Sequence, residues 1–156
     1  MSKRYLWCVL AVMSLAGCSL MGPSRADRQD SGRLDGADQA VAMGQYRGAE
    51  QLLSQYVYRD EGGRLKLKYF GINGDNRKRA INTVVSLLWE TGRDETLQQF
   101  ADDYLSGKEY RTIVCRLSER QGLFEQAYQC WNRIGEIDRA ERVIRSEAAL
   151  RILQQP

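Results

Sequence analysis

The chain has 156 residues, of which 28% are charged, and a net charge of +3 at neutral pH. This length suits one domain with a modest core, and so small a net charge does not support a general attraction to nucleic acid. The sequence contains no histidine, which removes the commonest general base and the commonest metal ligand. It also contains no phosphate-binding loop and no nucleophile-elbow motif. We therefore expect no enzyme activity, metal, cofactor, nucleic-acid partner or small-molecule substrate.

The N-terminus has the order of an export signal. Lys3 and Arg4 form a short cationic start, and the apolar run that follows, residues 5–16, is interrupted only by Ser14. The run has about the length of a signal-peptide core and is too short to cross a bilayer as a permanent helix. No later apolar stretch of the sequence is long enough to cross one either.

The run ends in Leu15-Ala16-Gly17-Cys18, which resembles the lipobox of bacterial lipoproteins. The resemblance implies cleavage after Gly17 and acyl chains such as palmitate on the new N-terminal residue, Cys18. Several acyl chains form a nearly permanent anchor, because each buried methylene contributes about 0.8 kcal/mol. Ser19, in place of an aspartate, implies the periplasmic face of the outer membrane. The alternative is an ordinary cleaved signal followed by a chance cysteine.

Behind the signal peptide, residues 1–17, we expect a tether and one domain. Residues 18–34 combine proline, glycine, serine and mixed charge, a composition typical of a flexible linker, whereas residues 35–156 are mostly helical in pattern. Removal of the signal takes away two positive charges and leaves 139 residues with a net charge of +1. Periodicity predicts helices over residues 35–43, 46–59, 76–91, 94–106, 109–121, 123–134 and 136–153.

Glycines separate these segments, and three of the junctions share one motif. A glycine is followed two positions later by a bulky apolar residue and five positions later by alanine, in Gly44, Tyr46 and Ala49, in Gly122, Phe124 and Ala127, and in Gly135, Ile137 and Ala140. The glycine permits the left-handed conformation that ends many helices. The bulky residue is expected to wedge between two helices, and the alanine to lie where their backbones approach closely. An apolar residue follows each alanine by four positions, at Leu53, Trp131 and Ile144.

The motif resembles the middle of the tetratricopeptide repeat (TPR). The resemblance implies an all-α fold in which short antiparallel hairpins stack as an irregular TPR-like solenoid, with one short extended basic segment. The spacing of the three copies departs from the repeat length of about 34 residues, and residues 92–97 are at best a degenerate copy. A generic helical bundle is the alternative.

Two of the four cysteines, Cys115 and Cys130, remain after Cys8 is removed with the signal and Cys18 is lipidated. The pair is a disulfide candidate because the periplasm is oxidising. With a turn near Gly122, the two residues lie at about the same height on antiparallel helices, and their bond would contribute about 3 kcal/mol by closing the loop. Two buried free thiols are the alternative, and a catalytic dithiol is disfavoured because redox pairs usually have the C-x-x-C spacing.

One segment breaks the helical pattern. Residues 64–69 alternate basic and apolar side chains between glycine-containing stretches, which predicts a strand or an ordered extended loop. The strand could fold back as a hairpin around Gly71, lie along the helices, or add to a partner's sheet. With the next helix start it offers a possible contact patch for lipid headgroups, an acidic protein or cell-wall polymer, and a solvated face is the alternative. The basic residues of this patch are Arg64, Lys66, Lys68, Arg77, Lys78 and Arg79.

These features predict a lipid-anchored binding or scaffold protein. Stacked hairpins form a concave groove that suits a partner helix or an extended peptide, and the build resembles that of small lipoproteins that assist envelope machines such as secretins, pili and secretion systems. We expect a membrane contact through the lipid and an envelope protein as partner. The alternatives are a structural lipoprotein that contacts wall or membrane through the basic patch and, less favoured, a cell-wall enzyme accessory. Trp89 and Trp131 are expected in the core.

Overall fold

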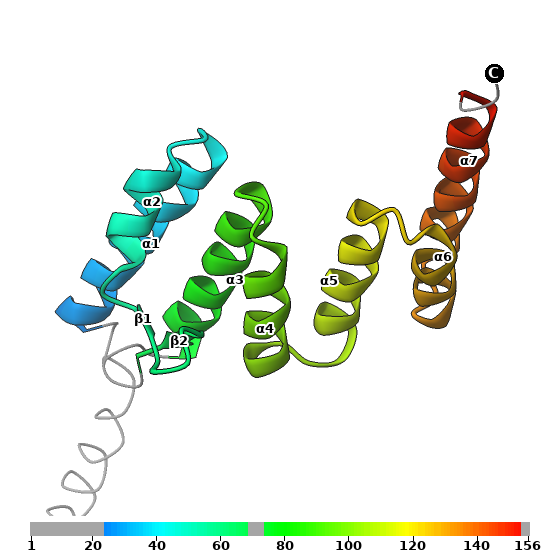
Figure 1. The fold of residues 1–156 in the computed structure, drawn as a ribbon. Coiled ribbons are helices and arrows are strands. Elements are labelled where there is room, and N and C mark those ends of the chain that lie inside the picture. The colour runs from blue at the N-terminus through cyan, green and yellow to red at the C-terminus, as the bar shows by residue number, and fades with distance from the viewer. Residues whose placement is uncertain (1–23, 69–73, 154–156) are drawn as a thin grey trace, which may run out of the picture.

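The structure, a computed structural model, describes residues 24–68 and 74–153, and shows an all-α fold. Figure 1 shows the helices side by side in a row, from α1 and α2 at one end to α6 and α7 at the other. The described residues form seven helices: α1 (Arg25–Ala42), α2 (Tyr46–Leu53), α3 (Gly74–Glu90), α4 (Asp94–Tyr104), α5 (Gly107–Arg120), α6 (Phe124–Arg133) and α7 (Ile137–Leu153). Strands β1 (Val57–Arg59) and β2 (Leu65–Leu67) form a small antiparallel sheet.

Four of the turns between helices have the same hydrogen-bonded geometry. In the α5–α6 turn, Gly122 has a φ of 74°, its N–H donates to the Glu119 carbonyl at 3.0 Å, and the Leu123 N–H donates to the Ser118 carbonyl at 2.9 Å. This pair of bonds is the Schellman motif, which needs a left-handed residue at the helix end. The same two bonds and a positive φ recur at Gly44, Gly92 and Gly135.

The turn at Gly92 has the geometry of the other three although residues 92–97 are at best a degenerate copy of the sequence motif. Its backbone is that of the other turns, and Leu97 takes the place of the motif's alanine with no exposed surface. A leucine is accommodated at this position because α3 and α4 pack within the larger core, where Leu97 contacts other buried side chains. The turn is therefore defined by its glycine and backbone, and less by the residue at the alanine position.

The motif's alanines are all fully buried, but its third copy does not wedge between helices. Tyr46 and Phe124 pack partly buried against the cores, as expected, whereas Ile137 is 52% exposed. Ile144 is also exposed, and Val143, one position earlier, is buried instead. The described chain ends with α7, so no later helix of that part covers this side of it. Two of the apolar positions predicted for this copy of the motif, Ile137 and Ile144, therefore face solvent.

The second half of the predicted tether is helical. Helix α1 begins at Arg25, and Ser24 caps it through a reciprocal pair of bonds with Asp27, each 3.1 Å long. Such a capping box satisfies backbone donors that the first turn leaves free. Leu34 is fully buried, and a Cβ placed on Gly36 would lie only 3.4 Å from the Leu52 side chain. Residues 25–34 of the predicted tether, Gly32 among them, thus belong to a packed helix. The signal, Cys18 and the rest of the tether lie outside the described residues.

The extended segment is a strand, but its partner differs from the prediction. Helix α2 ends at Leu53, not residue 59, and β1 pairs with β2 in a register that sets Val57 opposite Leu67. The hairpin therefore turns through residues 60–64, where Asp60 accepts from the Arg64 N–H at 2.9 Å, and not around Gly71, which lies outside the described residues. The Tyr104 hydroxyl accepts the Leu67 N–H at 2.9 Å, so α4 covers an edge of this small sheet.

The buried side chains form two cores that share α5. The larger core spans α1 to α5 and includes Ile113 and Leu117. The smaller core joins α5, α6 and α7, and among the residues whose burial the structure describes it contains five buried ones, Cys115, Ala127, Trp131, Ala140 and Val143. Alternate faces of α5 thus belong to different cores.

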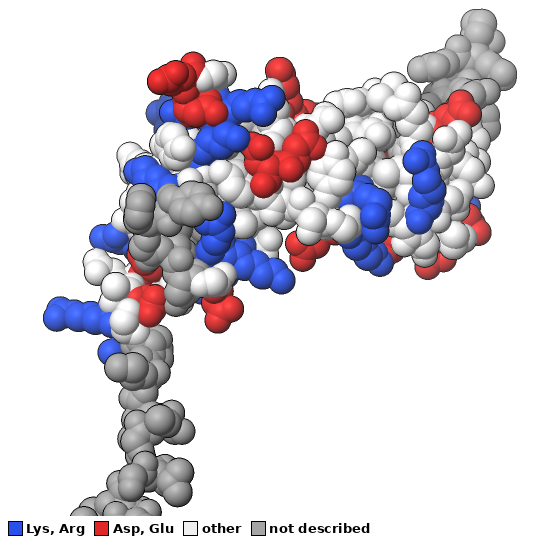
Figure 2. Space-filling model, turned by 90° about the horizontal axis from the view of Figure 1, so that it is seen from below, with Lys and Arg blue, Asp and Glu red and all other residues white. Residues whose placement is uncertain are grey.

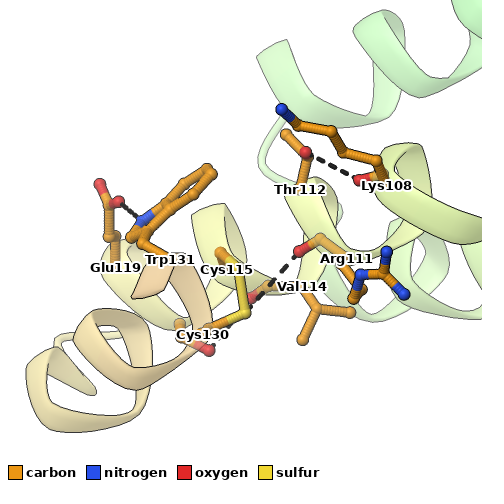
Figure 3. The surroundings of a disulfide bond; sticks show 9 residues. Lys108, Arg111, Thr112, Val114, Cys115, Glu119, Cys130 and Trp131 are labelled. Carbon is orange, nitrogen blue, oxygen red and sulfur yellow. Dashed lines mark hydrogen bonds between the residues drawn. A yellow bond between two sulfur atoms is a disulfide. The ribbon is translucent and has the colours of Figure 1, made fainter. Parts of the chain in front are cut away.

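The predicted disulfide is confirmed. Cys115 and Cys130 are bonded, and their Cα atoms are 5.4 Å apart across the α5–α6 pair. Figure 3 shows the bond between the two facing helices, beside the Trp131 side chain. Because the smaller core buries few side chains, the bond is expected to supply a large share of its stability.

Reduction of this disulfide should destabilise the protein by about 3 kcal/mol, the chain-entropy value for a loop of about 15 residues. Amide hydrogen exchange should quicken mainly in α6 and α7, because the larger core does not contain the bond. The double variant Cys115→Ala/Cys130→Ala should behave like the reduced protein and no longer respond to reductant. Equal acceleration in α1 to α3 would contradict the separation of the two cores.

Replacement of Gly122 by alanine should lower the free energy of unfolding by about 1 kcal/mol, because a Cβ disfavours a positive φ. No side chain lies within 4 Å of the added carbon, so the cost is one of backbone conformation alone. Gly48, inside α2, is the matched control: it also has open space and lacks a positive φ. Gly48→Ala should therefore raise stability by about 0.5 kcal/mol. Urea unfolding of both variants measures the contrast.

Candidate binding site between helices 5, 6 and 7

Half of the predicted basic patch is paired with acids of the same chain, at Lys66, Lys78 and Arg79. The Lys66 ammonium contacts Asp103 of α4 at 2.7 Å, and Lys78 lies 3.9 Å from Glu109 of α5. Figure 2 shows lysine and arginine atoms interspersed with acidic ones on the face seen from below, with no continuous basic surface.

Arg79 is the third member that is paired with acids, and Lys68 donates to a backbone carbonyl. The guanidinium of Arg79 pairs with Asp35 and Asp38 of α1, and the Lys68 ammonium donates to the Ser54 carbonyl at 2.9 Å. These bonds hold the strand and α3 against their neighbours, so much of the positive charge has a packing role.

A different site, which the sequence analysis did not single out, lies at the other end of the row. A pocket of about 610 Å³ opens between α5, α6 and α7. Arg116, Arg139 and Arg142 supply its positive charge, and Phe124 and Trp131 are among the apolar groups that line it. A hollow that combines apolar walls with a few charged groups has the usual composition of a binding site.

Arginines stack on two tryptophans, Trp131 in the pocket lining and Trp89 beside it. The guanidinium carbons of Arg116 and Arg120 lie 4.0 and 3.4 Å from the ring centre of Trp89, and that of Arg139 lies 4.7 Å from the ring centre of Trp131. These are cation–π distances, at which the ring face attracts the cation. Trp131 is buried in the core as predicted, but Trp89 is only half-buried, with two guanidinium groups against its ring.

The arginines differ in how their charges are balanced. Arg120 pairs with Asp94 at 3.1 Å and donates to the Trp89 carbonyl at 2.8 Å. In the part of the chain that the structure describes, Arg116 has no carboxylate within ion-pair distance. Burial lowers the pKa of the Arg116 guanidinium, and repulsion from Arg139 and Arg120 lowers it further. Its positive charge is therefore held where an anion would stabilise it.

The acid in the pocket wall is already engaged. The carboxylate of Glu119 accepts a hydrogen bond from the Trp131 indole N–H, as Figure 3 shows. This bond fixes the indole at the pocket edge and reduces the capacity of Glu119 to neutralise Arg116. The pocket thus keeps excess positive charge beside an aromatic surface.

Part of this site had a signal in the sequence. Arg116 and Arg120 are four positions apart and Arg139 and Arg142 three apart, so each pair lies on one helix face. The sequence does not show that the face of α5 meets Trp89 of α3 on one side and the face of α7 on the other. From the sequence alone, the arginines of residues 136–153 are therefore expected to form an ordinary solvated surface.

Comparison with known proteins adds no assignment. The chain matches no protein-family model, and neither a curated protein nor a solved structure matches it significantly. Within residues 24–68 and 74–153, no helix is both long and apolar enough to span a membrane. The same residues contain no cluster of three or more cysteine and acidic side chains placed to hold a metal ion.

Two neighbouring arginines should respond differently to replacement by glutamine. Arg120→Gln should lower the free energy of unfolding by about 1 kcal/mol, because Asp94 and the Trp89 carbonyl lose a charged partner. Arg116→Gln should change stability by less than about 0.5 kcal/mol, because lost stacking on Trp89 is offset by relief of repulsion. Urea unfolding of both variants compares them, and a larger loss for Arg116→Gln would show that its charge has a structural role.

Proposed function

We propose that this chain is a lipid-anchored scaffold on the periplasmic face of the outer membrane, which binds an envelope protein and assists assembly or stability of a machine such as a secretin, pilus or secretion system. The observation that carries the proposal is the pocket between α5 and α7. It is a polar and aromatic hollow on a stack of helical hairpins, with an arginine, Arg116, that forms no ion pair within the described residues.

The N-terminal sequence supports the proposed location at the outer membrane. A cationic start, an apolar run and Leu15-Ala16-Gly17-Cys18 occur in the order of a lipoprotein signal. The Cys115–Cys130 bond fits export, because structural disulfides persist in the periplasm and are rare in the cytosol. Both features are consistent with a domain held at a membrane surface outside the cytosol.

The arrangement of turns supports a TPR-like solenoid. Helices α1/α2, α3/α4 and α5/α6 form three hairpins with the same turn, and α7 packs on the last of them. The turns at Gly92 and Gly122 are 30 residues apart, near the TPR length of about 34. Those at Gly44 and Gly92 are 48 apart because the β-hairpin lies between them. Such stacks bind extended or helical segments of partner proteins.

A structural lipoprotein that uses the basic patch is the weaker candidate. Lys66, Lys78 and Arg79 are paired with acids on three different helices. A charge that is already paired gains less from a second anionic partner, since the first contact must be given up. The pocket at the other end of the row offers charge that is not paired in this way.

Replacement of Cys18 by serine tests the anchor, with Cys8→Ser as the control because Cys8 would leave with the signal. Cys18→Ser should move the protein from the membrane to the soluble fraction, or leave an unprocessed precursor of larger size. Cys8→Ser should change neither size nor location. Immunoblots of fractionated cells measure the size and the location of each variant. Unchanged membrane association of Cys18→Ser would contradict the lipid anchor.

Site-specific photocrosslinking tests the scaffold role. A photoreactive residue at Ser146, which lines the pocket, should give one discrete protein adduct in the native envelope. The same group at Gln126, which is two positions from Phe124 and on another face of α6, should give none. The Ser146 adduct should weaken in Cys18→Ser. Equal adducts at both positions, or adducts with lipid alone, would contradict a partner-binding pocket.

A further inference from the structure

The pocket contains two kinds of recognition surface side by side. Arg116 and Arg142 supply guanidinium groups, and Phe124 supplies apolar surface, whereas Trp131 and Val143 line the hollow but are buried. Trp131 and Val143 belong to the smaller core and fix the floor, whereas Phe124 is only partly buried. A ligand that fills the hollow must therefore offer an anionic group and an apolar group a short distance apart.

The arginines point to an anion with a planar, bidentate group. Neither Arg116 nor Arg142 has an ion pair within the described residues. Arg116 is half-buried and stacked on Trp89, so its guanidinium is held in one plane. A fixed guanidinium matches the two oxygens of a carboxylate with little further loss of side-chain entropy. Repulsion from the neighbouring arginines, which lowers the pKa of Arg116, would be relieved by the same carboxylate.

The shape of the site favours a peptide over other anionic surfaces. A planar membrane surface does not enter a hollow between helices, and a free inorganic anion would leave the exposed part of Phe124 uncovered. A partner peptide supplies aspartate or glutamate next to leucine or phenylalanine, and can lie along the groove between α5 and α7. This chemistry matches the charged and apolar walls together.

We propose that the pocket between α5, α6 and α7 binds an acidic segment of the partner protein, with a side-chain carboxylate on Arg116 and an adjacent apolar side chain against Phe124. This inference rests on the proposed scaffold function and names the chemistry of its partner. Arg139 and Arg142 form the far wall and bind a second acidic residue of the segment.

The test uses the full chain, purified in detergent, and a fluorescein-labelled peptide in which Asp and Glu alternate with Leu and Phe. Fluorescence anisotropy should show saturable binding that weakens with added salt. Arg116→Gln and Arg142→Gln should each weaken binding about tenfold or more. Arg145→Gln is the matched control, because Arg145 is on the same helix as Arg142, its side chain is 77% exposed, and it pairs with Glu141. Its binding should equal that of the unchanged protein.

Two altered peptides examine the two halves of the recognition. The amide peptide, with Asn and Gln in place of Asp and Glu, should not bind. The peptide with Ser in place of Leu and Phe should bind at least about tenfold more weakly than the original. Equal binding of the serine peptide, or its complete displacement by millimolar inorganic phosphate, would overturn the proposal in favour of a general anion site.

Folding defects are separated from binding defects by thermal unfolding. Arg142 is exposed, so Arg142→Gln should retain the unfolding midpoint of the unchanged protein. Loss of binding with an unchanged midpoint supports the proposal, and unchanged binding in both arginine variants overturns it. Failure here together with a discrete Ser146 adduct in the envelope would leave the scaffold function in place and reject only an acidic partner segment.

Discussion

The disulfide between Cys115 and Cys130 is the constraint on which the C-terminal half of the structure depends. It joins α5 to α6 at the centre of a core with few buried side chains. Helix α7 packs on that core through Ala140 and Val143, so the position of α7 follows from the bond between the two preceding helices. The pocket walls belong to these same three helices, and the oxidised state therefore sets the shape of the candidate site.

Helix α5 connects this small core to the rest of the molecule. Its Ile113 and Leu117 belong to the larger core, whereas Cys115 belongs to the smaller one. Two faces of one short helix thus have separate packing roles, and a third face carries Arg116 and Arg120. A helix that is held on two sides presents its remaining side chains in fixed positions, which suits the recognition of a flexible segment.

Along the row of helices, cations that are paired with acids hold elements together, whereas Arg116, which has no ion pair in the described residues, is available for recognition. Arg79 pairs with acids of α1, Lys66 with an acid of α4, and Arg93 with Glu50 of α2. Each of these cations joins two elements that also contribute side chains to the larger core. Arg116 instead stacks on Trp89 without an ion pair in the described residues, and repulsion from Arg139 and Arg120 outweighs attraction from Glu119 and Glu90. Charge that is left unbalanced inside a hollow is a common property of binding sites, because the ligand completes it.

The sequence alone determined the features that depend on neighbouring positions in the chain. Helical periodicity located most of the helices, and the need for a left-handed residue at a helix end located the turn glycines. Equal distance from Gly122 placed the two cysteines at the same height. Each of these features depends on residues within a single helical hairpin. The tertiary structure decided what depends on elements that are distant in sequence: the pairing of Val57–Arg59 with β2, the burial of Leu34 in a segment with the composition of a linker, the exposure of Ile137, and the stacking of Arg116 on Trp89. Each of these features depends on which surfaces come into contact when the hairpins stack. The residue pattern of one helix does not determine which other element packs against it.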